Sequence, residues 1–151
     1  MSSPPPPPCS AGKGEVPTPA VGAILTAPLR PAVRDLLSAD DFTIVTATLA
    51  RQHPELGWVA AEQRLVEALK FIATIARSTA DGLVPSGPVD AAWHALISNT
   101  AIYAELCARL GTFVHHYPSV TGTERPAPGW RDRTLAAIEA AGFEPAQELW
   151  T

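Results

Sequence analysis

Apolar positions recur at helical spacing along most of the chain beyond residue 32. Ser38 belongs to a residue type that caps helix N-termini, and Pro54 cannot continue a helix. Between these two residues, the apolar positions on one face are Phe42, Val45 and Leu49. The pattern therefore predicts a first helix over 39–52.

A second helix is expected from Gly57 to about Ser78, ahead of a turn at Asp81-Gly82. Most of its charged residues lie outside one apolar stripe, which consists of Trp58, Ala61, Leu65, Leu69, Ile72 and Ile75. A later helix fits 130–141, and Gly142-Phe143 supplies a C-terminal cap with an apolar contact. A short turn is expected over 145–150.

The stretch 86–110 is predicted to form the most apolar helix, with Ser86 as N-cap and Gly111 as C-terminal stop. One face carries Trp93, Leu96, Thr100, Tyr103, Cys107 and Leu110. Only a narrow strip around Ser98, Glu105 and Arg109 is polar. A helix that is apolar nearly all round lies in the middle of its domain, so we expect 86–110 to be the central buried helix.

No strand-like alternation extends beyond a few residues, and there is no internal repeat. The expected fold is all-α: residues 32–151 form a single-domain bundle of four to five helices around the central helix 86–110. Residues 1–31 contain nine of the 16 prolines and are expected to be a disordered, proline-rich arm.

Composition narrows the functional classes. Charged residues make up 17% of the chain, the net charge is −4, and no block of Lys and Arg occurs, which argues against nucleic acid as a partner. No apolar run is long enough to cross a membrane, and the N-terminus lacks the pattern of a secretion signal. We therefore expect a cytoplasmic protein, and its Ala- and Pro-rich composition suggests a high-GC bacterial source.

The candidate chemistry is carried by three of the four histidines. Asp90 and His94 are four residues apart and hence neighbours on one helical face, where a carboxylate can orient an imidazole as in an acid–base dyad. An ordinary ion pair in the first helical turn explains the same spacing. His115 and His116 are adjacent, so only one of them can readily serve a given metal ion. Zinc or iron is the candidate cofactor for His94, His115 and His116.

A single site shared by His94 and the later pair is disfavoured if the helix is straight. From 94 to 110 such a helix rises about 24 Å, and five further residues recover at most about 17 Å. The gap closes only if the chain doubles straight back or if the helix breaks near Ser98-Asn99. A site across a dimer, two separate sites, or a meeting of His53 with the later pair remain open alternatives.

The other notable side chains have a plain structural interpretation. Cys107 lies on the apolar face, where a lone cysteine usually packs as a small hydrophobe. Trp93 and Tyr103 fit core aromatics whose polar tips find partners. In the alternative, functional interpretation, Trp93, Tyr103 and Cys107 form a surface that binds a ligand or partner, together with Tyr117. Sequence signatures of phosphate-binding loops, nucleophile elbows and zinc proteases are missing.

One combination of residues is specific enough to suggest a family. It consists of Leu83-Val84-Pro85-Ser86, Val89-Asp90-x-x-Trp93-His94-x-x-Ile97, Thr100-x-x-Tyr103-x-x-x-Cys107, Gly111 and His115-His116-Tyr117-Pro118. This pattern resembles the N-terminal domain of glycine-rich domain-containing proteins, a plant, fungal and bacterial family without a settled activity. The closing segment, from Arg133 to Trp150, is similar but looser.

The resemblance covers roughly 40–151 and implies a helical domain, here in a short stand-alone form without the glycine-rich region. The family often has Trp-His-x-His, where this chain has Leu96 in place of the second histidine. That replacement bears on any metal role that needs the histidine pair.

Three functional hypotheses follow. The leading one is a small helical module that binds a small molecule or a protein partner, alone or as an oligomer. The second is an enzyme of bacterial specialised metabolism, either metal-dependent or using an Asp90–His94 dyad with His94 as general base. The third assigns the function to the proline arm and leaves the bundle as a scaffold.

Overall fold

The helices begin and end at the capping residues that the sequence provides. The computed structural model describes residues 32–118 and 124–151. In it, α1 (Ala39–Gln52) follows Ser38, whose Oγ accepts a hydrogen bond from the backbone N–H of Asp41. The next helix, α2 (Gly57–Arg77), begins at the predicted glycine. The predicted ranges of both helices are confirmed.

Short elements open and close the described chain. The 3-10 helix η1 (Val33–Leu36) precedes α1, and η2 (Gln147–Leu149) follows α5 (Trp130–Ala140). After α5 the predicted cap forms: Gly142 is left-handed with φ 92°, and the N–H of Phe143 donates to the Ile138 carbonyl at 3.1 Å.

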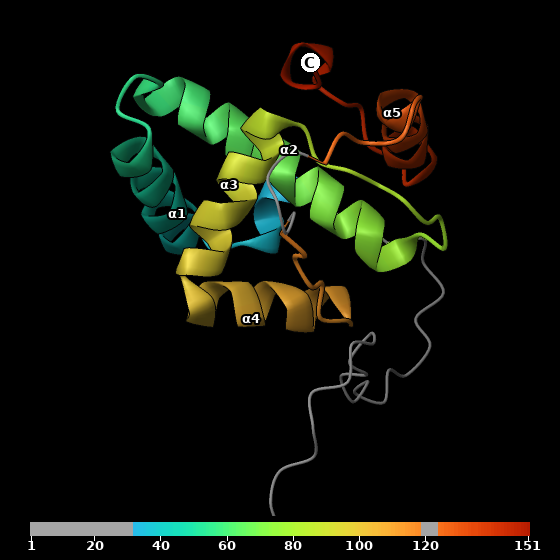
Figure 1. Cartoon of the computed structure of the whole chain (residues 1–151). Coiled ribbons are helices and arrows are strands. Elements are labelled where there is room, and N and C mark those ends of the chain that lie inside the picture. Colours follow the sequence, from blue (N-terminus) through green and yellow to red (C-terminus); the bar gives the residue numbers. More distant parts are fainter. Residues whose placement is uncertain (1–31, 119–123) are drawn as a thin grey trace, which may run out of the picture.

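The prediction of one continuous helix over 86–110 is wrong. This stretch forms two helices, α3 (Gly87–Ser98) and α4 (Thr100–Leu110), and the chain changes direction between them at Asn99 (Figure 1). The Asn99 side-chain Nδ2 donates to the Ala95 carbonyl at 2.8 Å and to Thr48 Oγ1 of α1 at 3.1 Å. The asparagine therefore caps the end of α3 and ties this corner to α1.

The break also changes which helix is central. α2 packs against η1, α1, α3 and α5, and α3 lies between α1, α2 and α4 (Figure 1). In α4, by contrast, Ala101, Ala104 and Ala108 are exposed. Only the first half of the predicted central helix is thus enclosed by neighbours, because α4 turns away across the end of the bundle.

The C-terminal segment is fastened to α2 through a buried carboxylate. Glu67 Oε1 accepts hydrogen bonds from the Trp150 indole Nε1 at 2.7 Å and from the Ala146 N–H at 3.1 Å. Its Oε2 accepts one from Lys70 Nζ at 2.9 Å, and Lys70 also donates to the Glu144 carbonyl. Trp150 is fully buried, with its ring 5.7 Å from that of Phe71. The last residues therefore belong to the core.

The described residues confirm the expected all-α, single-domain bundle. No helix among them has the length and apolar character that crossing a membrane requires. The predicted disordered arm over 1–31 and the middle of the predicted loop, 119–123, lie outside the described residues.

Candidate metal centre

A short return segment, residues 112–118, brings the late histidines back toward α3. Gly111 ends α4 in the left-handed conformation with φ 81°, which lets the chain reverse. The buried Tyr103 of α4 then holds the segment: its hydroxyl donates to the Val114 carbonyl and accepts a hydrogen bond from Trp93 Nε1 at 3.0 Å. This chain of hydrogen bonds connects α3, α4 and the return segment.

Side chains of the return segment alternate between the two sides of the chain. Val114 is buried and His116 is 13% exposed, whereas His115 and Tyr117 are exposed. This alternation is what an extended chain produces when one of its sides faces a core. The expectation that adjacent histidines point in different directions is confirmed, and His116 is the one that faces α3.

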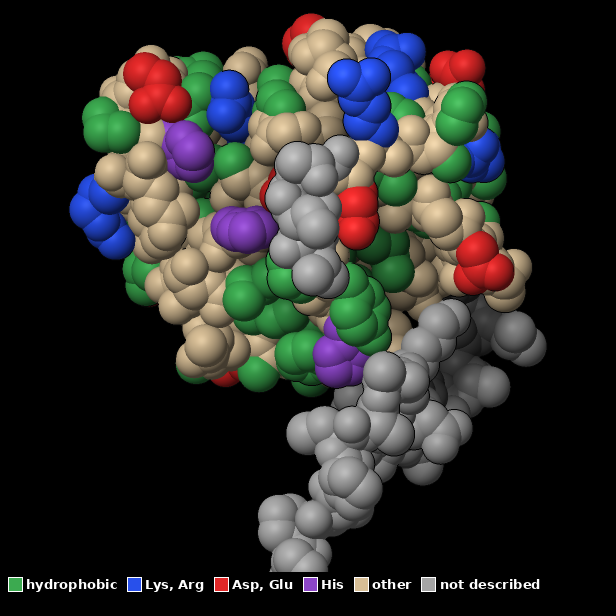
Figure 2. Space-filling view, in the orientation of Figure 1, with side chains coloured by type: hydrophobic (Ala, Val, Ile, Leu, Met, Phe, Trp, Pro, Cys, Tyr) green, Lys and Arg blue, Asp and Glu red, His purple; other side chains and the backbone are tan. Residues whose placement is uncertain are grey.

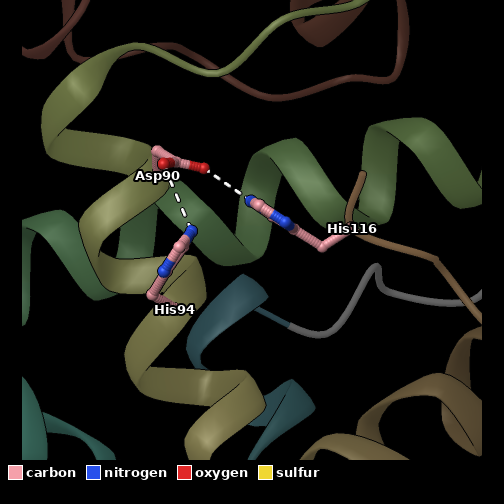
Figure 3. A group of neighbouring side chains, drawn as sticks. All are labelled: Asp90, His94 and His116. Atoms are coloured by element: carbon pink, nitrogen blue, oxygen red, sulfur yellow. Dashed lines mark hydrogen bonds and ion pairs between the residues drawn. The ribbon is translucent and has the colours of Figure 1, made fainter. Parts of the chain in front are cut away.

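His116 meets the Asp90 and His94 pair on α3 (Figure 3). Its Nε2 lies 2.7 Å from Asp90 Oδ1, a hydrogen-bonding distance. His94 Nε2 lies 3.4 Å from the other carboxylate oxygen, Oδ2. The two imidazole rings meet edge to face at 4.6 Å between centroids, and the His116 ring also contacts Trp93 at 4.5 Å. The carboxylate thus lies between two histidines from different segments.

These separations suit the coordination shell of a metal ion. The three residues each offer a ligand atom within 4.8 Å of the others. With bonds of about 2.0–2.1 Å, neighbouring ligand atoms lie about 2.9 Å apart at right angles and about 3.4 Å apart in a tetrahedron. The side chains of Asp90 and His94 are 38% and 55% exposed, so rotation can bring their ligand atoms to these separations around an ion.

The expected separation of His94 from His116 is wrong. The helix breaks at Asn99, and the chain reverses after Gly111. These are the two conditions under which His94 can approach the later histidine pair, and both occur. Among the described residues, the group that could hold a metal ion is Asp90, His94 and His116, and it is not a three-histidine site. The group therefore contains two of the predicted ligands, His94 and His116, together with Asp90.

The remaining two histidines lie elsewhere. His115 turns outward, with its ring 4.8 Å from Phe113 and 6.2 Å from Tyr117. His53 follows α1, where its Nδ1 lies 3.4 Å from Glu55. The suggested meeting of His53 with His115 or His116 is not observed, since each of these rings has other neighbours.

Buried polar groups beneath the site have a structural role. Burial raises the pKa of the Tyr103 phenol above its ordinary value, and it raises the pKa of the Cys107 thiol as well. A thiol that resists ionisation and is almost fully buried fits the small-hydrophobe interpretation of Cys107.

Two clefts adjoin the cluster. The first has a volume of about 630 Å³ and a largely apolar wall made by Ile97, Tyr103, Phe113, Val114 and Pro118. The second, about 960 Å³, is lined by the loop between α2 and α3, which includes Asp81, and by other side chains that include Asp90 and Glu124. His94, His115, His116 and Pro118 border both clefts, so the cluster lies where they meet.

The surface around the cluster carries little positive charge. In the space-filling view, histidine and hydrophobic side chains occupy the middle and lower part of the face, and Lys and Arg lie toward its top and margins (Figure 2). Among the described residues that line the two clefts, none is Lys or Arg.

Of the predicted binding residues, Tyr103 lines the first cleft, Trp93 and Tyr117 line the second, and Cys107 lines neither. Sequence reasoning missed Ile97 and Phe113, because an apolar residue in a cleft wall has the same pattern as one in the core. Comparison of the chain with protein-family models, with curated proteins and with solved structures found no match.

Proposed function

We propose that this domain binds a divalent transition metal ion through Asp90, His94 and His116 and presents the ion to small molecules in the adjoining clefts. The observation that carries the proposal is the convergence of the three ligand atoms, within 4.8 Å of one another, where two clefts meet. The proposal combines two hypotheses from the sequence, a module that binds a small molecule and a site that binds a metal ion.

The ligand types favour zinc or ferrous iron. Zinc sites that bind a substrate commonly have three protein ligands and one open position, and two histidines with one carboxylate also hold non-haem iron. An ion held by three residues keeps coordination positions for water or a ligand oxygen. Such an ion acts as a Lewis acid and lowers the pKa of a bound water.

A second candidate is acid–base chemistry without a metal. The dyad that the distances favour is Asp90 with His116, at 2.7 Å, rather than the predicted Asp90 with His94, at 3.4 Å. In this alternative the carboxylate orients the His116 ring, and the more exposed His94 exchanges protons with a ligand.

Membership of the glycine-rich domain-containing family is likewise a proposal. The three proposed ligands all fall within its most specific stretch, 85–118. Leu96, which replaces the family's second histidine, is fully buried in this fold. The third ligand that we propose is His116. The absence of a histidine at position 96 therefore removes no ligand from the proposed site.

Cobalt binding tests the proposal. We expect protein purified without a histidine tag to bind Co²⁺ in the ratio of one ion to one chain, with visible d–d absorption that Zn²⁺ abolishes by competition. His94→Ala, His116→Ala and Asp90→Asn should each weaken binding by about tenfold or more, since each removes one of three ligands. His115→Ala and His53→Ala are matched controls and should bind as the parent does.

Equal loss of cobalt in the His115→Ala and His116→Ala variants would contradict the proposed ligand set. A folded protein that binds neither Co²⁺ nor Zn²⁺ would overturn the metal proposal and leave the dyad. Circular dichroism of each variant separates loss of a ligand from loss of the fold.

A further inference from the structure

We infer that the small molecule bound at this ion has an oxygen-donor head with at most one negative charge and an apolar body of aromatic size that lies in the first cleft. The inference rests on the proposed metal site and adds the chemical class of its ligand. It is carried by the lining of the two clefts, because the first is largely apolar and the second adds the carboxylates of Asp81, Asp90 and Glu124.

The first cleft supplies the apolar contact. Phe113 is a large hydrophobic side chain left 38% exposed there, and its ring meets the Tyr103 ring edge to face at 5.6 Å. Ile97 on α3 and Val114 on the return segment line the same cleft as His94 and His116. A flat apolar body gains most from such a surface, since aromatic and aliphatic walls bury it without leaving polar groups unpaired.

The charges at the site limit the negative charge of the head and disfavour an anionic body. Two neutral imidazoles, one carboxylate and a divalent ion leave a single net positive charge at the site, which matches a monoanionic head. Beyond the ion, the described lining of the clefts has no Lys or Arg, and the second cleft adds Asp81 and Glu124 to Asp90. A phosphorylated or otherwise polyanionic molecule would therefore lack counter-charges and face repulsion.

Size agrees with a small molecule. The volume of about 630 Å³ falls within the range of about 300–1,000 Å³ that is typical of small-molecule sites. His94 and His116 border this cleft as well as the second one. One small molecule can therefore bind the ion with its head and contact Phe113 with its body.

Three hydroxamates with the same chelating head test the inference on the Co²⁺-loaded protein. Acetohydroxamate has a methyl body, benzohydroxamate a phenyl body, and 4-carboxybenzohydroxamate a phenyl body with a negative charge. We expect benzohydroxamate to bind at least about tenfold more tightly than acetohydroxamate, because the phenyl ring becomes buried. The added carboxylate should remove most of that gain. Binding is followed by the change in the cobalt spectrum, and metal analysis after dialysis checks that the ion stays bound.

Phe113→Ala should lower the ratio of the two affinities toward one while Co²⁺ affinity stays unchanged, and Ile97→Ala serves if the first variant does not fold. Trp58→Ala, a change at an exposed aromatic of α2 outside both clefts, is the control. Equal affinity for acetohydroxamate and benzohydroxamate, or no effect of the added carboxylate, would overturn the inference while leaving the metal site intact. Failure of Co²⁺ binding itself would instead overturn the proposed function.

Discussion

Tyr103 helps to position His116 by holding the return segment at Val114. Its hydroxyl is the shared partner of the Trp93 indole and the Val114 carbonyl, two residues before His116. The sequence indicates a buried tyrosine whose polar tip needs a partner. It does not indicate that this partner belongs to the return segment, because the register of an irregular segment depends on contacts made after the helices have packed.

The raised pKa of Tyr103 predicts loss of stability in alkali. In the unfolded chain the phenol ionises near pH 10, whereas burial disfavours the phenolate in the fold. The stabilising contribution is therefore complete below pH 10 and is lost as the pH rises above it. In Tyr117→Phe, where Tyr103 is the only tyrosine, tyrosinate absorbance at 295 nm should appear together with unfolding. Ionisation near pH 10 in a protein that circular dichroism shows still folded would contradict this.

At the scale of elements, helix ends were predictable and the corner between α3 and α4 was not. Ser38, Ser86 and Gly111 act within a few residues of themselves, so their effect can be read locally. Asn99 is only mildly unfavourable inside a helix. The break is stabilised there by its hydrogen bond to Thr48, 51 residues away, which no local pattern reveals.

Replacement of Asn99 should therefore affect both stability and metal affinity. We expect Asn99→Ala to lower the free energy of unfolding by about 1–2 kcal/mol, since the cap and the bond to Thr48 are both lost. Co²⁺ affinity should fall as well, because the corner sets where the return segment places His116. Urea denaturation and cobalt titration measure the two effects. Thr43→Ala, which removes only a local, exposed bond to the Ala39 carbonyl, is the control. Unchanged stability would show that the corner is not held by this side chain.

At the scale of the whole molecule, one buried carboxylate fastens the C-terminal segment to α2. Glu67 of α2 receives the Trp150 indole, 83 residues later in the chain, and the backbone of Ala146. From the sequence alone this glutamate belongs to the polar side of an amphipathic helix. Its burial follows from the way the C-terminal segment covers α2, just as the meeting of Asp90 and His116 follows from chain reversal rather than from any motif.

Removing this carboxylate should cost far more than removing one at the surface. We expect Glu67→Ala to destabilise the domain by about 3–5 kcal/mol, because it leaves the buried Trp150 indole and the partly buried Ala146 N–H without their acceptor and removes the ion-pair partner of Lys70. Glu67→Gln should cost less, since an amide oxygen still accepts a hydrogen bond. The matched control is Glu62→Ala, which breaks a surface ion pair with Arg34 and should cost below about 1 kcal/mol. Similar melting temperatures for Glu67→Ala and Glu62→Ala would contradict the role of Glu67.

The contact between the Trp93 and His116 rings, at 4.5 Å, gives the site its own optical reporter. An indole in contact with a metal ligand should lose fluorescence when a paramagnetic ion such as Cu²⁺ or Co²⁺ binds, and keep most of it with Zn²⁺. Of the four tryptophans, Trp93 should account for most of the quenched emission, so Trp93→Phe should remove most of the response. Occupancy of the site can thus be followed at micromolar protein concentration without any added label.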